Sequence, residues 1–139
     1  MSAWVKPRAI SGSIFNNDGG GWNTGLLGFH GGKLSLFIYN NGYLDSPNTA
    51  VVDRWLFVTA TRDGVTGVNR LYENGVQVNT STNTYSPSGS PHKFAIGIPN
   101  PGCCQMDAPG YFNGFIDDAR LYTSALSATE IKQLYNSGR

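Results

Sequence analysis

The sequence has few charged residues, few cysteines and no long hydrophobic run. Charged residues make up 14% of its 139 residues, and the formal net charge is +1. The lysines and arginines are scattered, so no basic stripe is available to follow a nucleic-acid backbone. The apolar runs are short and interrupted, which argues against insertion into a membrane. At this length we expect one domain, over residues 1–139, with a single hydrophobic core.

The only two cysteines are adjacent, as Cys103 and Cys104. A disulfide between neighbours needs a strained tight turn, because the Cα atoms of bridged cysteines are normally more than about 4.4 Å apart. The preceding Pro101-Gly102 pair favours a turn. A disulfide between the two, a pair of free thiols and a bridge to another chain all stay open. A metal site built on this pair is not expected, since no further ligands stand at a recognisable spacing.

The sequence is also poor in the groups that catalysis needs. A glycosidase needs two carboxyl groups flanking the bond it cleaves. Of the two glutamates, Glu130 is explained by a helix cap and Glu73 adjoins a hairpin turn. His30 and His92 are single histidines with no nucleophile or acid beside them, and no phosphate loop or nucleophile elbow is present. We therefore expect that the protein is not an enzyme.

Short apolar runs separated by turn residues dominate what is present. Turn signals recur about every 8–12 residues, which is typical of an antiparallel β-sandwich. The clearest hairpin has Asn74-Gly75, the preferred type I′ pair, at its tip, with Leu71 expected opposite Val78. The run 55–61 is the most apolar and should be a central strand. We expect strands at residues 3–7, 10–15, 26–30, 33–39, 55–61, 68–73, 76–79, 93–98 and 115–122, with long loops at 16–25, 80–90 and 99–110.

The end of the chain predicts one helix. Ser127 and Glu130 form an S-x-x-E capping box, in which each side chain satisfies a backbone N–H of the other residue. Ile131, Leu134 and Tyr135 then give an apolar stripe at helical spacing. One short C-terminal helix should therefore pack on the strands.

Several short motifs occur in a fixed order along the chain. They are a tryptophan before a proline at 2–7, "GKLSL" at 32–36, "DRWLFVTATRDG" at 53–64, "RLYENGV" at 70–76, "FAIG" at 94–97, and "IDD", "RLY", "ALS" and "EIKQLY" at 116–135. Taken in order, they resemble the motifs of a known family, the laminin G-like domains of the concanavalin A-like superfamily. The resemblance covers the chain nearly end to end and implies an all-β fold: an antiparallel β-sandwich jelly roll with one short C-terminal helix. It also implies a role in recognition or adhesion.

One departure from the family concerns the start of the chain. Relatives carry one or two strands before the tryptophan strand, whereas Met1 here stands immediately before it. The sequence is either a trimmed segment or a minimal form. A missing strand leaves a sheet edge with unpaired backbone groups, to which a second chain can add. This predicts self-association, or docking on a larger assembly, through an open edge near the N-terminal strand.

The resemblance also implies a candidate calcium ligand. In sandwich-fold carbohydrate-active proteins the aspartate after the isoleucine of this strand often helps to hold a structural Ca²⁺, and Asp117 matches that position. Calcium takes six to eight oxygens. The competing interpretation is that Asp117 or Asp118 pairs with Arg120 or caps backbone groups. As neighbours on a strand, the two aspartates should point to opposite faces. Asn16 and Asp18 with the carbonyls of the glycine-rich loop are a second candidate, against ordinary turn chemistry.

Carbohydrate binding is the remaining site hypothesis. Trp22 stands amid polar residues in a glycine-rich loop, where a large aromatic is costly unless it packs or binds; the alternative is that it folds back over a sheet edge. Tyr85 is a further loop aromatic, and for Tyr39 and Tyr43 the alternative is ordinary packing on a sheet face. The predicted ligand-binding residues are Asn16, Asp18, Trp22, Asn23, Tyr39, Tyr43 and Tyr111. The aromatics predicted to lie in the core are Trp4, Trp55, Phe57 and Phe115.

From these residues and the resemblance together we expect a non-catalytic recognition domain. Its partner should be a carbohydrate or glycoprotein at an extracellular or cell-surface site. The main alternative is a structural or assembly protein, such as a decoration subunit on a virion surface, that acts through protein contacts.

Overall fold

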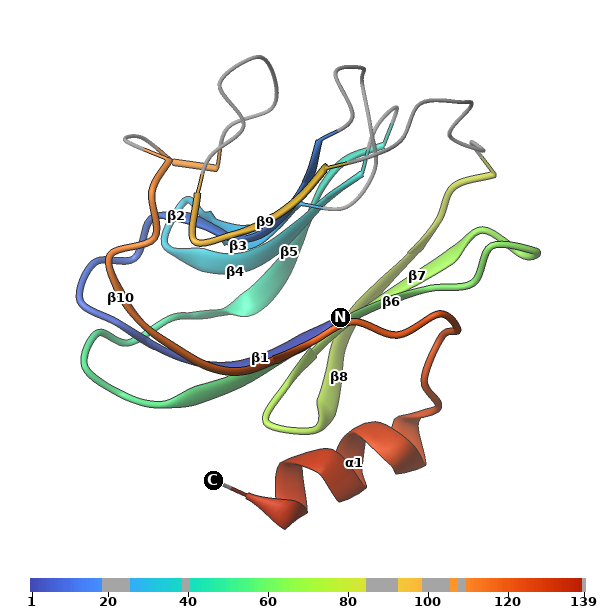
Figure 1. Cartoon of the computed structure of the whole chain (residues 1–139). Coiled ribbons are helices and arrows are strands. Elements are labelled where there is room, and N and C mark those ends of the chain that lie inside the picture. Colours follow the sequence, from blue (N-terminus) through green and yellow to red (C-terminus); the bar gives the residue numbers. More distant parts are fainter. Residues whose placement is uncertain (19–25, 39–40, 85–92, 99–105, 108–109, 139) are drawn as a thin grey trace.

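The computed structural model describes residues 1–18, 26–38, 41–84, 93–98, 106–107 and 110–138. Within them the chain forms ten strands followed by one helix. Figure 1 shows two layers of strands with the helix on the outer side of one of them. The elements are β1 (Ser2–Pro7), β2 (Gly12–Asp18), β3 (Leu26–His30), β4 (Lys33–Ile38), β5 (Gly42–Thr49), β6 (Leu56–Arg62), β7 (Val68–Glu73), β8 (Val76–Thr82), β9 (Lys93–Ile96), β10 (Gly114–Arg120) and α1 (Ala128–Ser137).

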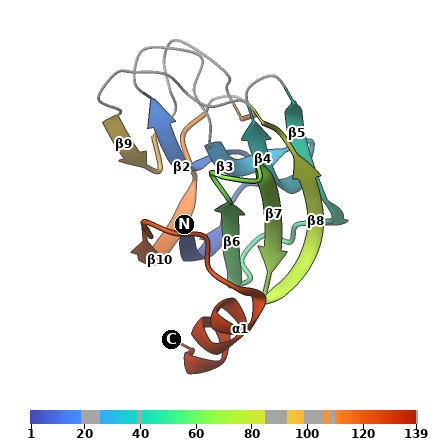
Figure 2. The ribbon, with the colours of Figure 1, turned by 90° about the vertical axis from the view of Figure 1, so that its right-hand side faces the viewer.

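The strands form two antiparallel five-stranded sheets. The first has the order β10-β1-β6-β7-β8 and the second the order β5-β4-β3-β2-β9. Figure 2 shows β9 and β10 on one side of the sandwich and β5 and β8 on the other. The predicted antiparallel β-sandwich with one C-terminal helix is confirmed. So is the central position of the most apolar strand, since β6 is the middle strand of the first sheet.

The hydrophobic core lies between the sheets and follows the alternation of side chains along each strand. On β4, Leu34, Leu36 and Ile38 are buried in the core, while Ser35 and Phe37 point to the opposite face. The same alternation on the neighbouring strands gives the second sheet a polar and aromatic outer face.

Helix α1 begins at the predicted capping box. The side chain of Ser127 accepts a hydrogen bond from the Glu130 N–H, and the Glu130 carboxylate accepts one from the Ser127 N–H at 2.7 Å. Ile131 is fully buried against Trp4, Phe57 and Tyr72 on the outer face of the first sheet. The helix therefore covers this face, whereas the outer face of the second sheet has no helix over it in the described part of the chain.

Of the aromatics predicted to lie in the core, Trp4 and Phe57 are buried and Trp55 packs against them partly buried. The prediction for Phe115 is wrong, because its side chain is 47% exposed. Phe115 lies on β10, an edge strand among the described residues, with the Arg8 guanidinium 4.9 Å above its ring. An apolar run on an edge strand has less of the molecule to pack against than the same run in the sheet centre.

Two further points differ from the expectation. The expected strands do not include residues 42–49, where the structure has β5; its Pro47 is tolerated because β5 borders the second sheet, and a proline is accepted on an edge strand. Opposite Leu71 stands Asn79 rather than Val78, since the register of β7 and β8 shifts between Leu71 and Tyr72.

The open edge predicted beside the N-terminal strand is not found there. Strand β1 lies between β6 and β10 and pairs with both. Its neighbour β10 borders the sheet in the described part of the chain, but it carries a bulge and the charges of Asp117, Asp118 and Arg120. Bulges and charges are devices that discourage a second chain from pairing with an edge.

Candidate functional site

The outer face of the second sheet gathers polar and aromatic side chains from three neighbouring strands. His30 ends β3, Phe37 lies on β4, and Tyr43 and Asp45 lie on β5. The register places Phe37 opposite Tyr43 and Ser35 opposite Asp45. Together with Asp107, which packs beside β3, these side chains form the group that we call the outer-face cluster: His30, Ser35, Phe37, Tyr43, Asp45 and Asp107.

The aromatic part of the cluster is a stack. The rings of His30 and Tyr43 have centroids 3.7 Å apart with an interplanar angle of 3°. Phe37 meets Tyr43 edge-on, with ring centroids 5.1 Å apart. All three rings are partly exposed, so the sheet presents a small aromatic platform to solvent.

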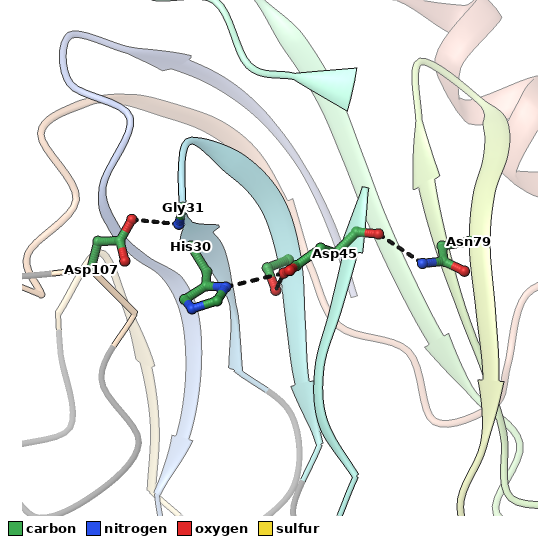
Figure 3. A network of polar contacts seen from close by, with 6 residues as sticks. His30, Gly31, Asp45, Asn79 and Asp107 are labelled. Atoms are coloured by element: carbon green, nitrogen blue, oxygen red, sulfur yellow. Dashed lines mark hydrogen bonds and ion pairs between the residues drawn. The ribbon is translucent and has the colours of Figure 1, made fainter. Parts of the chain in front are cut away.

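The polar part of the cluster is organised around Asp45 (Figure 3). Its Oδ1 lies 3.3 Å from His30 Nδ1 and accepts a hydrogen bond from Ser35 Oγ at 2.6 Å. On the other side, Asn79 Nδ2 on β8 donates to the main-chain carbonyl of Asp45 at 2.7 Å. The carboxylate is therefore held in place while its side chain stays 36% exposed.

Asp107 is tied to the end of β3 by two hydrogen bonds. Its Oδ2 accepts the Gly31 N–H at 2.7 Å (Figure 3), and its own N–H donates to the Phe29 carbonyl at 3.2 Å. The preceding Met106 is fully buried over Gly28, where an added Cβ would lie 2.8 Å from Met106 Cγ. Glycine at position 28 thus lets the segment 106–107 approach the sheet. This segment brings a second carboxylate, that of Asp107, to the cluster.

These surroundings act on the Tyr43 phenol. Burial raises the pKa of Tyr43 above its ordinary value, and the charges of Asp107 and Asp45 raise it further. The phenol is consequently a neutral hydroxyl near pH 7, able both to donate and to accept a hydrogen bond.

Serine, histidine and aspartate meet here, but not in the order that nucleophilic catalysis requires. In a catalytic triad the histidine contacts the serine hydroxyl and removes its proton. Here the Ser35 hydroxyl is fully buried and donates to Asp45 instead. The arrangement orients a carboxylate and does not activate a serine.

The structure brings one of the predicted ligand residues, Tyr43, into the cluster. Asn16 is 2% exposed on β2 and donates through Nδ2 to the Ile98 carbonyl at 3.4 Å. Tyr111 is exposed but bridges to Ser13 on β2, which is separated from β5 by two strands. Asp18 ends β2. Trp22, Asn23, Tyr39 and the loop aromatic Tyr85 lie outside the described residues, as do His92, Cys103 and Cys104.

Sequence reasoning missed His30, Phe37, Asp45 and Asp107 as site residues. The signal for Phe37 was present, since it shares the non-aliphatic face of its strand with Tyr39 in the printed sequence. Because strand β5 was not expected, nothing in the sequence singled out Asp45 as a site residue. Asp107 could not be selected from local pattern either, since it contacts Gly31, 76 positions away.

The predicted calcium ligand, Asp117, lies on the edge strand β10 beside a bulge. Asp117 is exposed, and its Oδ1 accepts the N–H of Asp118 at 2.9 Å. Asp118 has a left-handed φ of 48° and pairs with Arg120 at 2.7 Å, which raises the pKa of Arg120. The bulge here interrupts the alternation that would send the two aspartates to opposite faces. Among the described residues no three His, Cys, Asp or Glu side chains lie together as a metal site, so they fit calcium poorly.

Comparison with known proteins identifies a family that matches most of the chain. A laminin G-type family model, described as the concanavalin A-like lectin/glucanases superfamily, matches residues 1–132. Comparison with curated protein sequences finds no match. No helix within the described ranges is long and apolar enough to cross a membrane.

Three solved structures are similar to the chain over almost its whole length. A heptameric SAP-like pentraxin from Limulus polyphemus matches with a TM-score of 0.77 and 18% identity, over 96% of this chain and 67% of its own. A protein from Bacteroides ovatus, described as a candidate carbohydrate-binding protein, matches with a TM-score of 0.70 and 20% identity, over 95% and 39%. Domain 4 of AbnA, an extracellular arabinanase from Geobacillus stearothermophilus in complex with arabinotriose, matches with a TM-score of 0.69 and 22% identity, over 96% and 64%. At these identities the likeness shows the fold alone.

Proposed function

Since the chain belongs to the concanavalin A-like lectin/glucanases superfamily, we propose that it is a non-catalytic carbohydrate-binding domain whose site is the outer-face cluster. The observation that carries the proposal is the stacked pair of His30 and Tyr43 rings beside two anchored carboxylates, Asp45 and Asp107. Ligand sites typically combine an apolar or aromatic surface with a few placed polar groups.

Each part of the cluster has a role in holding a sugar. The exposed ring surfaces of His30, Phe37 and Tyr43 receive the apolar C–H face of a pyranose or furanose. Asp45 and Asp107 accept hydrogen bonds from sugar hydroxyls, and the neutral Tyr43 hydroxyl donates one in return. Because Ser35 already orients Asp45, little side-chain entropy is lost when the ligand binds.

Two structural neighbours support a carbohydrate as the ligand class. The Bacteroides ovatus protein is described as a candidate carbohydrate-binding protein, and the structure of the arabinanase domain is described as a complex with arabinotriose. This chain spans 39% and 64% of the lengths of these two proteins, so carbohydrate binding by this chain is our proposal. An extracellular location, which the arabinanase's description suggests, is part of the same proposal; the alternatives are a cell or virion surface.

Binding without catalysis accords with the positions of the two glutamates. Glu130 is engaged in the helix cap, and Glu73 accepts a hydrogen bond from Asn48 Nδ2 at 2.8 Å. The buried Ser35 hydroxyl is engaged with Asp45. A hydrolase test with aryl glycosides and arabino-oligosaccharides should release no product; product that disappears on Asp45→Asn would make the cluster an active site instead.

The binding test uses a glycan array followed by calorimetric titration with arabinotriose and the array's strongest ligands. We expect Tyr43→Ala to weaken binding at least about tenfold, since one aromatic contact with its hydrogen bond is lost. Phe115→Ala removes an exposed ring from the opposite sheet and should bind as the unaltered protein does. Undiminished binding by Tyr43→Ala would overturn the assignment. Loss of binding in Trp22→Ala alone would place the site in the 16–25 loop, as the sequence predicts.

Self-association is a second candidate function, favoured by one observation. On the edge strand β9 and just beyond it, Phe94, Ile96 and Ile98 are exposed at alternate positions, so they form one apolar row. The pentraxin neighbour is described as heptameric. Light scattering over a concentration series should show an oligomer that Ile96→Lys dissociates. A monomer at every concentration would remove this candidate and leave carbohydrate binding untouched.

A further inference from the structure

Three Asn-Gly pairs occur in the sequence, and the structure describes all of them: Asn41-Gly42, Asn74-Gly75 and Asn113-Gly114. An asparagine that precedes glycine can react with its own backbone, because glycine has no Cβ to crowd its nitrogen and turns easily to present it. The three pairs share this chemistry, so their surroundings decide which of them reacts.

The reaction needs only water. The deprotonated glycine nitrogen attacks the side-chain carbonyl carbon of the asparagine and forms a new C–N bond. The bond from that carbon to the side-chain nitrogen breaks, and ammonia leaves with the proton that the glycine gave up. Water then opens the resulting succinimide ring at either of its carbonyl carbons. The products are aspartate and isoaspartate, and in isoaspartate the main chain runs through the former side chain.

The pair at the tip of the β7–β8 hairpin is restrained on both sides. Asn74 Oδ1 accepts the Phe57 N–H at 3.0 Å, and the Asn74 N–H donates to the Phe57 carbonyl at 2.8 Å. Gly75 is buried against helix α1, where an added Cβ would lie 3.0 Å from Tyr135 Cβ. The Asn74 side chain must therefore leave Phe57 before its carbonyl carbon can meet the glycine nitrogen.

The pair at the start of β10 is held against β1 by its backbone. The Asn113 carbonyl accepts the N–H groups of Arg8 at 2.8 Å and Ala9 at 3.4 Å. Gly114 stands opposite Pro7, and an added Cβ would lie 2.9 Å from Pro7 Cα. The peptide group between residues 113 and 114 must turn to bring its nitrogen to the side chain, so it must first break these contacts.

The pair at the start of β5 lacks such restraints. Asn41 is exposed, and its side-chain amide has no hydrogen-bond partner among the residues that the structure describes. An added Cβ on Gly42 would meet nothing within 4 Å. Gly42 stands opposite Ile38 in the last pair of the β4–β5 ladder, and the end of a ladder opens at little cost. The side chain and the glycine nitrogen can therefore meet without disturbing the core.

We propose that Asn41-Gly42 is a site of spontaneous deamidation, and that the isoaspartate formed there weakens ligand binding at the outer-face cluster. Tyr43 follows the pair directly and stands opposite Phe37. Isoaspartate lengthens the main chain by one methylene just before Tyr43 and adds a negative charge, so the phenol ring can no longer keep its place in the stack. The effect on binding rests on the proposed function, whereas the modification itself does not.

The first test compares the three pairs within one protein. The folded protein is incubated in mildly alkaline buffer and sampled over days, and trypsin then releases the pairs in separate peptides, 34–54, 71–93 and 94–120. Mass spectrometry measures the conversion of each asparagine. We expect Asn41 to be converted at least about tenfold faster than the other two, since breaking a hydrogen bond before the reaction slows it by up to that factor.

The same incubation in guanidinium chloride is the control for the sequence. Without the fold the three pairs should react at similar rates, so a difference seen only in the folded protein comes from the structure. Conversion of Asn74 or Asn113 as fast as that of Asn41 in the folded protein would overturn the proposal. So would an Asn41 that the fold slows as strongly as it slows the other two.

Two variants isolate the effect on binding. Asn41→Gln cannot form the five-membered ring, so it should keep its affinity for the array-selected sugar throughout the incubation. Asn113→Gln changes an exposed asparagine of the opposite sheet and should age as the unaltered protein does. The aged unaltered protein is separated by ion exchange, which resolves the added charge, and its isoaspartate fraction is titrated by calorimetry.

We expect the isoaspartate fraction to bind the sugar about tenfold more weakly than fresh protein, as Tyr43→Ala does, because the same aromatic contact is lost. Equal affinity of the two would overturn the effect on binding. If the fresh protein itself binds no sugar, the proposed function fails, and the peptide comparison still decides whether Asn41 is the site of modification.

Discussion

Asn79 and Asp45 join the two sheets at one side of the sandwich, through a 2.7 Å hydrogen bond from the Asn79 amide to the Asp45 carbonyl. The two residues belong to edge strands of different sheets. On the same side chain, Asn79 Oδ1 accepts the Thr80 N–H at 2.8 Å. This contact fixes the strand that presents Tyr43 and Asp45 to solvent.

The first prediction tests that contact. Asn79→Ala removes the donor and leaves the partly buried Asp45 carbonyl without it, so we expect the free energy of unfolding to fall by about 1 kcal/mol. Urea denaturation followed by tryptophan fluorescence measures the change. Gln77→Ala, an exposed position on the same strand, should change stability by less than about 0.5 kcal/mol. Equal stability of the Asn79→Ala and Gln77→Ala proteins would show that the sheets do not depend on this bond.

The second prediction concerns the close approach at Gly28. An added Cβ would lie 2.5 Å from the Gly12 carbonyl oxygen and 2.8 Å from Met106 Cγ. Gly28→Ala should therefore cost about 1–3 kcal/mol, the usual range for overpacking, and displace the segment that carries Asp107. Gly64→Ala is the matched control, since nothing lies within 4 Å of its added Cβ.

The measurement for Gly28→Ala combines stability with binding. If Met106 anchors Asp107 to the cluster, the variant should lose affinity for the array-selected sugar as well as stability. A destabilised protein that binds sugar normally would remove Asp107 from the proposed site while leaving Tyr43 and Asp45 in it.

Much of the fold could be predicted from local pattern. The strands at 26–30 and 68–73 and the capping box at Ser127 and Glu130 depend on neighbours in the sequence, and the structure has them as predicted. Strand β5 was missed because Pro47 counts against a strand unless its edge position is known. The position of an edge depends on the arrangement of the whole sheet, which no local pattern carries.

The candidate site was less predictable for a related reason. Asp45 meets Ser35 only through the register of β4 and β5, and Asp107 meets Gly31 across 76 residues. Tyr43 could be selected as an aromatic beside a turn, but its partners come from pairing between distant segments. Phe115 shows the converse error, in which an apolar run was read as core although its strand borders the sheet.

The third prediction concerns calcium. Because the described residues around Asp117 fit calcium poorly, we expect the same melting temperature in excess calcium and in a chelator. A ligand present at a hundred times its Kd would stabilise the fold by about 2.7 kcal/mol, so a tight site would be visible. A higher melting temperature in calcium that Asp117→Asn abolishes would restore the ligand predicted from the sequence. A rise abolished by Asp18→Asn would indicate the glycine-rich loop instead.

The fourth prediction concerns acid stability at the turn between β6 and β7. The Asp63 carboxylate accepts the N–H groups of Thr66 at 3.1 Å and Val65 at 2.8 Å, and these bonds lower the pKa of Asp63 below its ordinary value of 3.8. A carboxyl whose pKa is lowered on folding stabilises the native state above its ordinary pKa. This stabilisation is lost as the pH falls through the pKa of the folded state, because the carboxyl is then protonated in both the folded and the unfolded protein.

The comparison that isolates this effect is Asp63→Asn, whose amide oxygen can accept the same two N–H groups but does not titrate in this range. We expect the melting temperature of the unaltered protein to fall more steeply than that of Asp63→Asn as the pH drops below about 3.8. Above pH 5 the two curves should run parallel, since Asp63 is then ionised in both the folded and unfolded states. Curves that stay parallel down to pH 2 would mean that the turn does not favour the charged form of Asp63.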